Sequence, residues 1–218
     1  MNAYLGADLV TARRARFTAE AEWARTAALV RRRRVRRAAE PTRMGDRLCI
    51  RAMEPADVGH LRSLSGRLSM RSRQLRYLAP VRSVSEATLR VLAAVDHENH
   101  EALGAFDEGE LIAVAHYFRD ANAAGRAEIS VEVADSHQRR GIGQRLMNDL
   151  ARLARERGIT EFIATASLEN HGVLAMVHNS PWPSQVRRSG PELDIAVTLP
   201  DTADVPAQRS DVALAPCS

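Results

Sequence analysis

The most informative segment of this sequence is a strand that leads through a basic, glycine-containing loop directly into an amphipathic helix. Residues 127–133 alternate between apolar and other side chains, which is typical of a strand. Residues 144–157 predict a helix, and Gly158 stands where a C-terminal capping glycine is expected. Its apolar stripe comprises Leu146, Met147, Leu150, Leu153 and Ala154. The loop between strand and helix reads Gln138-Arg139-Arg140-Gly141-Ile142-Gly143.

The rest of the chain from residue 48 adds strands and helices around this unit. A hairpin is expected where two apolar runs flank the turn Asp107-Glu108-Gly109. Ser83 with Glu86 predicts a capping box at the start of a helix. A hairpin followed by a strand–helix–strand unit indicates an α/β fold with a mixed central sheet. The strands are expected at 48–52, 103–106, 111–118, 127–133, 159–166 and 192–199. One helix is expected to start at residues 54–57 and to hold Val58, Leu61 and Leu64, a second to hold Met70, Leu75 and Leu78, and a third to follow the box at Ser83 and to hold Leu89, Leu92 and Ala93. Two further helices are expected at 144–157 and 171–178.

The loop has the chemistry of a phosphate site. The amides at a helix start have no partners inside the helix, and the helix dipole makes that end positive. Glycines let the backbone approach an anion closely, and Arg139 and Arg140 add positive charge. Two other phosphate-binding motifs lack residues that they require. The P-loop needs a lysine, and this chain has none. The dinucleotide-binding fingerprint needs three glycines, and this loop has two.

The same residues resemble the signature of the GNAT superfamily of N-acetyltransferases, Gln/Arg-x-x-Gly-x-Gly/Ala. Gln138, Gly141 and Gly143 match it, and the order of elements over residues 48–170 is also similar. The pattern Ser-x-x-Ser-x-x-x-Arg-Tyr at Ser69–Tyr77 resembles the bacterial protein-acetylating branch. The resemblance implies the GNAT fold, with acetyl-CoA as the acyl donor and an amine as the acceptor.

The resemblance also implies roles for individual residues. Gln138 belongs to the cofactor loop, and the backbone amides of Arg139, Arg140, Gly141, Ile142, Gly143 and Gln144 would hold the coenzyme A pyrophosphate. The main chains of Val131 and Val133 would bond the pantetheine arm. Asn170 matches an asparagine near the cofactor, and it also suits a helix cap.

Transfer in this family proceeds by direct attack of the amine, and a carboxylate is a common base. Glu128 is the first candidate and Glu132 the second, because period-two spacing places both on one face of the strand. Many relatives carry a tyrosine after the asparagine to protonate the leaving thiolate. Residues 171–186 contain none and offer His178, Ser180 and Ser184 instead.

Three functions follow from the sequence: two rest on the cofactor loop, and the third is a nucleic-acid-associated protein that uses the Arg-rich N-terminal segment, with the acetyltransferase fold as a scaffold. The first is an acetyl-CoA-dependent N-acetyltransferase acting on a protein lysine or a small-molecule amine. The alternative is a catalytically silent domain that binds an acyl-CoA and acts as a sensor, which the absent tyrosine favours. The polar stretch Asp96–Glu101 lacks the spacing of a zinc site and is interpreted as a connection, so no metal is expected.

Charge divides the chain of 218 residues into unequal parts. Residues 1–50 hold 12 arginines against 5 acidic residues, whereas the remainder holds 19 against 22. The expected organisation is an Arg-rich helical extension over 1–43, a GNAT domain over 44–200 and a tail over 201–218. The run Arg31–Arg37 is either a solvated arm or a weak contact for nucleic acid or an anionic surface. No apolar run approaches the roughly 20 residues of a membrane span, and Cys49 and Cys217 fit no metal spacing, so a cytoplasmic protein is expected.

Overall fold

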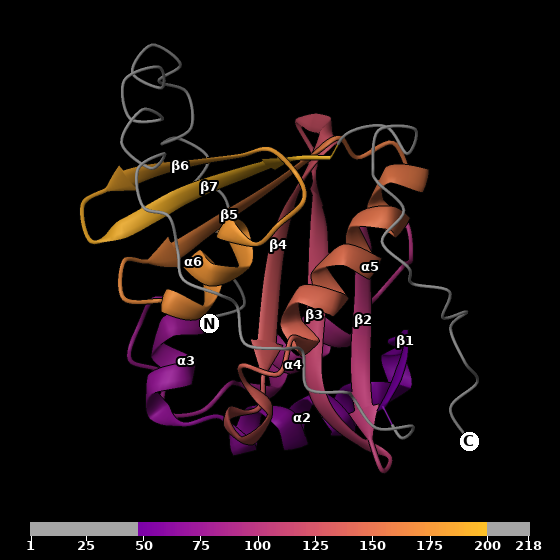
Figure 1. The fold of residues 1–218 in the computed structure, drawn as a ribbon. Helices are drawn as coiled ribbons and strands as arrows, with labels where there is room; N and C mark the ends of the chain where they lie inside the picture. Colours follow the sequence, from indigo (N-terminus) through magenta and orange to yellow (C-terminus); the bar gives the residue numbers. More distant parts are fainter. Residues whose placement is uncertain (1–47, 200–218) are drawn as a thin grey trace.

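A computed structural model describes residues 48–199, which form one twisted sheet with helices on both faces (Figure 1). The predicted extension, the Arg31–Arg37 run and the predicted boundaries at 43/44 and 200/201 lie outside these residues. The strands are β1 (Leu48–Ala52), β2 (His100–Asp107), β3 (Glu110–Asp120), β4 (Ala123–Val133), β5 (Glu161–Ser167), β6 (Ser184–Ser189) and β7 (Glu192–Thr198). The helices are α2 (Val58–Arg67), α3 (Met70–Tyr77), α4 (Glu86–Ala93), α5 (Ile142–Glu156) and α6 (His171–His178).

The sheet has seven strands in the order β1-β2-β3-β4-β5-β7-β6. Every neighbouring pair is antiparallel except β4 and β5, which run parallel and are connected through α5. The predicted mixed sheet of an α/β protein is therefore confirmed. In Figure 1, β5, β7 and β6 fan away from β4, so the sheet opens on the side where α6 lies.

Alternation along the strands separates two apolar cores. On β4, Ala127 and Ile129 face α5, whose buried residues include Leu146 and Leu150. The other face of the sheet is covered by α2 and α4, whose Leu64, Leu89 and Leu92 pack on β2 and β3. Within residues 48–199, no helix is long and apolar enough to cross a membrane.

Two local expectations need correction. The predicted capping box at Ser83 and Glu86 is wrong: Ser85 is the N-cap of α4, and its hydroxyl accepts a hydrogen bond from the Thr88 amide at 3.1 Å. Glu86 is then the first helical residue, so it cannot reach back as a box requires. Strand β6 was not predicted, because its sequence Ser-Gln-Val-Arg-Arg-Ser lacks clear alternation. It forms through pairing with β7, which is a tertiary effect.

Candidate functional site

The site begins where β4 and β5 separate. Their pairing covers only Arg126↔Glu161, Ala127↔Phe162 and Glu128↔Ile163. Beyond these pairs β4 continues to Val133 beside β3, and β5 continues beside β7. The β5-facing side of residues 129–133 therefore has no neighbouring strand. Such an edge offers backbone N–H and C=O groups to an extended ligand.

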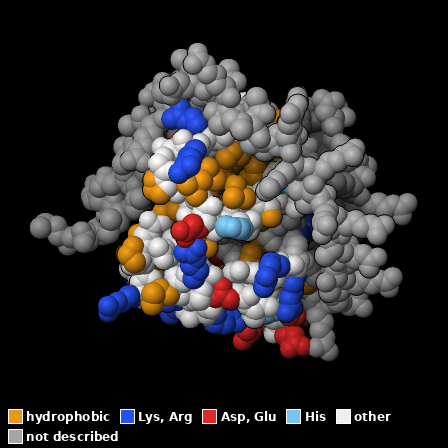
Figure 2. Space-filling view, turned by 60° about the vertical axis from the view of Figure 1, so that its left-hand side comes forward, with side chains coloured by type: hydrophobic (Ala, Val, Ile, Leu, Met, Phe, Trp, Pro, Cys, Tyr) orange, Lys and Arg blue, Asp and Glu red, His pale blue; other side chains and the backbone are white. Residues whose placement is uncertain are grey.

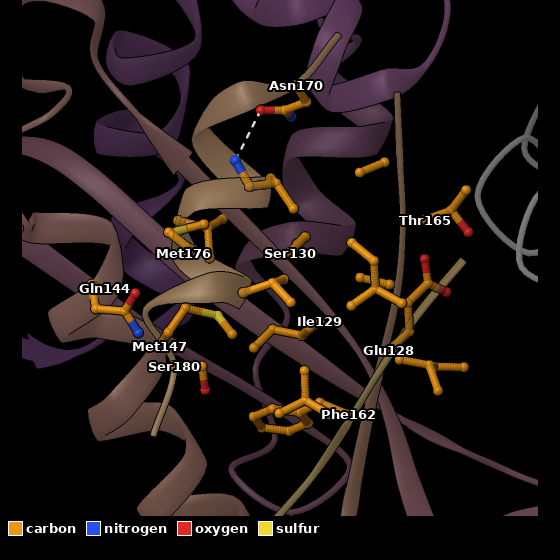
Figure 3. A pocket seen from close by; sticks show the side chains of 18 of the residues that line it. Glu128, Ile129, Ser130, Gln144, Met147, Phe162, Thr165, Asn170, Met176 and Ser180 are labelled. Carbon is orange, nitrogen blue, oxygen red and sulfur yellow. Dashed lines mark hydrogen bonds between the residues drawn. The ribbon is translucent and has the colours of Figure 1, made fainter. Parts of the chain in front are cut away.

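A cavity of about 100 Å³ occupies this opening. In the close-up, Gln144 and Met147 of α5 lie toward one end, and Glu128 and Thr165 lie toward the other (Figure 3). The cavity therefore runs from the start of α5 to the base of the split between the strands. Its further lining comes from α3, β4, β5, α6, β7 and the segment after α6: Leu75, Arg76, Ile129, Ser130, Val131, Phe162, Ile163, Ala164, Ala166, Asn170, Val173, Met176, Val177, Ser180, Trp182, Ile195 and Val197.

The loop that precedes α5 keeps its helix N-terminus open. Gly141 is the N-cap, with φ of 81°, and no side chain caps the first amides of α5. Arg139 also has a positive φ of 61°, and the side chains of Arg139 and Arg140 are exposed. An uncapped helix start beside two arginines is a favourable place for an anion.

Gly143 serves close packing. A Cβ placed on it would lie 3.1 Å from Met176 Sδ and 3.5 Å from both Val131 Cγ1 and Val133 Cγ2. The absence of a side chain therefore lets the first turn of α5 approach β4 and α6. Ile142 is buried in the core, so its side chain is not available to a ligand.

The side chain of Gln138 holds its own loop together. Its Nε2 donates to the Val133 carbonyl at 3.1 Å and to Asp135 Oδ1 at 2.9 Å. A third hydrogen bond, of 3.2 Å, reaches Ser72 Oγ on α3. These contacts tie the loop to the end of β4 and to α3.

The two candidate bases occupy different surroundings although they share one face of β4. Glu128 lines the cavity. Glu132 is buried, with 7% of its surface exposed, and its Oε1 lies 2.9 Å from Arg76 Nε. It also accepts a hydrogen bond from the Tyr77 hydroxyl at 3.1 Å. Burial is the main cause that raises the pKa of Tyr77, followed by the negative charge of Glu132. This phenol therefore stays protonated.

Asn170 caps α6 and lines the cavity. Its Oδ1 accepts a hydrogen bond from the Val173 amide at 3.1 Å, drawn as the dashed line in Figure 3. The helix-cap interpretation is thus confirmed, and the position beside the cavity leaves the cofactor role as a prediction.

The end of α6 and the segment after it carry no tyrosine. Val177, in the last turn of α6, and Ser180, two residues after the helix, line the cavity there. His178 and Ser184 are not among the lining residues. Of the three replacements that the sequence offered, Ser180 is thus the hydroxyl at the cavity.

The stretch Asp96–Glu101 leads into β2, and the carboxylates of Asp96 and Glu101 are already bonded within the chain. Asp96 Oδ1 accepts hydrogen bonds from the amides of Glu98, Asn99 and His100 at 2.8–2.9 Å. Glu101 is buried, with Oε2 2.9 Å from Arg157 Nη2. Among the described residues, no group of three or more His, Cys, Asp or Glu side chains could hold a metal ion.

Sequence reasoning missed the contribution of α3. Leu75 and Arg76 reach the cavity from a helix about 50 residues before β4, and Arg76 Nη2 donates to Ser130 Oγ at 2.8 Å. Ser130 could have been found, because it lies between Glu128 and Glu132 on the same face of the strand.

On the side of the molecule that is on the left in Figure 1, apolar side chains gather beside arginine, acidic and histidine side chains (Figure 2).

Comparison with known proteins gives a consistent result. The model of the acetyltransferase (GNAT) family matches residues 69–178, about half of the chain. Acetyltransferase Pat of Mycolicibacterium smegmatis is 35% identical over 132 residues, which are 59% of this chain and 39% of that protein. Acetyltransferase PA5475 of Pseudomonas aeruginosa is 28% identical over 133 residues, 59% of this chain and 71% of that protein. The crystal structure of the GNAT domain of S. lividans PAT superposes with a TM-score of 0.64 at 26% identity, covering 69% of this chain and 89% of that domain.

Proposed function

Because the chain belongs to the GNAT family of acetyltransferases, we propose that it transfers an acetyl group from acetyl-CoA to an amine. The chain spans 39% of the length of Pat, so the proposal concerns this domain. The acceptor is an amine on a protein lysine or on a small molecule. One observation carries the proposal: the unpaired edge of β4 joins an uncapped helix start to a carboxylate, Glu128, along one cavity.

The residues present suit a coenzyme A thioester. The amides from Arg139 to Gln144 would receive the pyrophosphate at the positive end of α5. Val131 and Val133 belong to the strand edge that has no partner on the β5 side, so their main chains would bond the pantetheine arm. The apolar lining, with Met147 and Met176, suits the aliphatic parts of that arm.

Glu128 is the proposed general base. Acetyl-CoA supplies an activated thioester carbonyl, and the amine must be deprotonated before its lone pair can attack that carbon. Glu128 lies at the end of the cavity away from the α5 N-terminus (Figure 3), so its carboxylate accepts this proton directly or through water. An amide of the unpaired β4 edge would polarise the carbonyl oxygen as negative charge develops on it.

Ser180 is the proposed hydroxyl at the leaving thiolate. It lines the cavity close to Val177, after the helix where many relatives carry a tyrosine. A serine hydroxyl is too weak an acid to give up a proton alone, so it would pass a proton from solvent to the sulfur.

A thiol-release assay tests the proposal. Purified protein is incubated with acetyl-CoA and a panel of small amines, polyamines and lysine peptides, and free thiol and acetylated product are both quantified. Product and thiol in equal amounts are expected for at least one amine class. Binding of CoA by calorimetry, with no thiol released from any amine, would contradict transfer and favour a silent acyl-CoA-binding domain.

Residues 44–200 are the proposed folding unit for this activity, with 1–43 and 201–218 as appended segments. A variant spanning 44–200 should keep CoA affinity within about twofold, whereas a loss of folding would place the boundary elsewhere.

Polynucleotide binding by this variant and by the full chain, compared at two salt concentrations, separates the two interpretations of Arg31–Arg37. Salt-sensitive binding by the full chain alone favours a nucleic-acid contact, and no binding by either favours a solvated arm.

A further inference from the structure

Helix α3 forms the wall of the cavity on the sheet face opposite α5. Leu75 and Arg76 contribute side chains to that wall. Arg76 is held by two residues of β4: its Nη2 donates to Ser130 Oγ at 2.8 Å, and its Nε lies 2.9 Å from Glu132 Oε1. The C-terminal half of α3 is therefore fixed to the strand that carries Glu128.

The N-terminal end of α3 is fixed to the proposed cofactor loop. The Ser69 amide donates to Asp135 Oδ2 at 2.6 Å, and the Ser72 hydroxyl donates to Asp135 Oδ1. Gln138 Nε2 donates to the same Asp135 oxygen at 2.9 Å and to Ser72 Oγ at 3.2 Å. The start of α3 thus bonds directly to two residues of the segment that leads into Gly141.

The charge of Asp135 strengthens this attachment. Partial burial raises the pKa of Asp135, but the hydrogen bonds from Ser72, Ser69 and Gln138 outweigh it and hold the pKa below its usual value. The group is therefore a carboxylate at neutral pH. A carboxylate at a helix N-terminus is favoured by the helix dipole and by charge-assisted hydrogen bonds.

A third contact joins α3 to the other side of the opening. Arg71 Nη2 lies 2.5 Å from Glu169 Oε2, in the segment between β5 and α6. Ser72 lies three and four residues before Leu75 and Arg76, so these side chains share one face of α3. A shift of Ser72 would therefore move both cavity residues.

From these contacts we propose that Asp135 and Ser72 couple occupancy of the cofactor loop to the position of α3, and hence to the acceptor end of the cavity. Both are positioning residues, and the inference rests on the proposed function. A ligand on the amides of residues 139–144 would stabilise the loop in the position that bonds Ser72, and with it the face of α3 that carries Leu75 and Arg76.

Hydrogen exchange with CoA as the probe tests the coupling without requiring turnover. In the wild type, CoA should slow amide exchange in residues 142–146 and also in residues 70–77. In Asp135→Ala and Ser72→Ala, protection of 142–146 should persist while the CoA-dependent protection of 70–77 is lost. Ser72→Thr keeps the hydroxyl, so the CoA-dependent protection of residues 70–77 should be retained in this variant. Ser136→Ala is the matched control, because the Ser136 hydroxyl bonds His137 at 2.8 Å and not α3.

Steady-state kinetics give a second readout. Ser72→Ala should raise the acceptor KM roughly fivefold to tenfold, a change of about 1 kcal/mol. The acetyl-CoA KM should stay within about twofold, and Ser72→Thr should be close to the wild type.

The outcomes separate the two proposals. Protection confined to 142–146 in the wild type, or equal protection of α3 in Ser72→Ala, overturns the coupling and leaves the acetyltransferase proposal intact. Protection of both segments with no product from any amine overturns the transfer and leaves the coupling intact. Failure of CoA to protect either segment overturns both.

Discussion

Arg76 Nε lies 2.9 Å from Glu132 Oε1, so the second of two glutamates on one face of β4 is already paired with a cation. Glu128, four residues earlier on the same face, lines the cavity. The two residues therefore have different expected roles, base for Glu128 and structural support for Glu132. Mutation can separate these roles.

Glu128→Gln should lower kcat by roughly 10²- to 10⁴-fold, because the amide cannot accept the proton of the amine. Affinity for CoA, measured by calorimetry, should change little, since the cofactor loop is untouched. Glu156→Gln is the control, because Glu156 is exposed on α5, away from the cavity lining. A Glu128→Gln enzyme with wild-type kcat and an unchanged pH–rate profile would remove Glu128 from the mechanism.

Glu132→Gln should act mainly on stability. It leaves the largely buried Arg76 without its carboxylate partner, which is expected to cost about 2 kcal/mol. Urea unfolding would measure this loss. The acid limb of the pH–rate profile should keep its position, since another group takes the proton. If that limb disappears in Glu132→Gln and persists in Glu128→Gln, the two assignments must be exchanged.

Gly141→Ala should weaken CoA binding. Gly141 has a φ of 81°, where a side chain costs about 1 kcal/mol. The loop would relax toward another conformation, and a loss of roughly fivefold to tenfold in CoA affinity is expected. Gly59→Ala serves as the control, because Gly59 lies inside α2 with nothing within 4 Å of an added Cβ. Equal affinities for the two variants would argue against a ligand at this loop.

Asp57→Asn should reveal a pH-dependent contribution to folding. Arg51 Nη1 and Nη2 each lie 2.7 Å from an oxygen of Asp57, and this hydrogen bonding is the largest cause that lowers the pKa of Asp57. Because its pKa is lower in the folded than in the unfolded protein, ionised Asp57 adds to the free energy of unfolding at pH values above its unfolded pKa of about 3.9. This contribution is lost as the pH falls through the folded-state pKa.

The wild type should therefore exceed Asp57→Asn in free energy of unfolding by about 2 kcal/mol at pH 7. The difference should shrink as the pH falls below about 4. Urea unfolding curves at several pH values between 7 and 3 would measure it. If the difference in free energy of unfolding stays constant over this range, the charge of Asp57 is not what stabilises the fold, and its packing and hydrogen bonds are.

Much of the fold could be predicted because its signals are local. The stripe from Leu146 to Ala154 predicted α5, and the turn at Glu108-Gly109 predicted the hairpin of β2 and β3. Strand β6 could not be predicted, because its weak alternation is overridden by pairing with β7. The start of α4 was misplaced by two residues, since Ser83 and Ser85 are equally good caps by residue type.

In the candidate site, too, some features could be predicted from local sequence and others depend on tertiary contacts. The sequence alone predicted an anion site at the start of α5, because a basic glycine loop that runs into a helix can be recognised from residue types along one short segment. It also placed Glu128 and Glu132 on one face of β4, because strand periodicity is two. Only the tertiary structure decided which of them faces the cavity. That choice depends on where β5 leaves β4 and on Arg76, which α3 brings from a distant part of the chain.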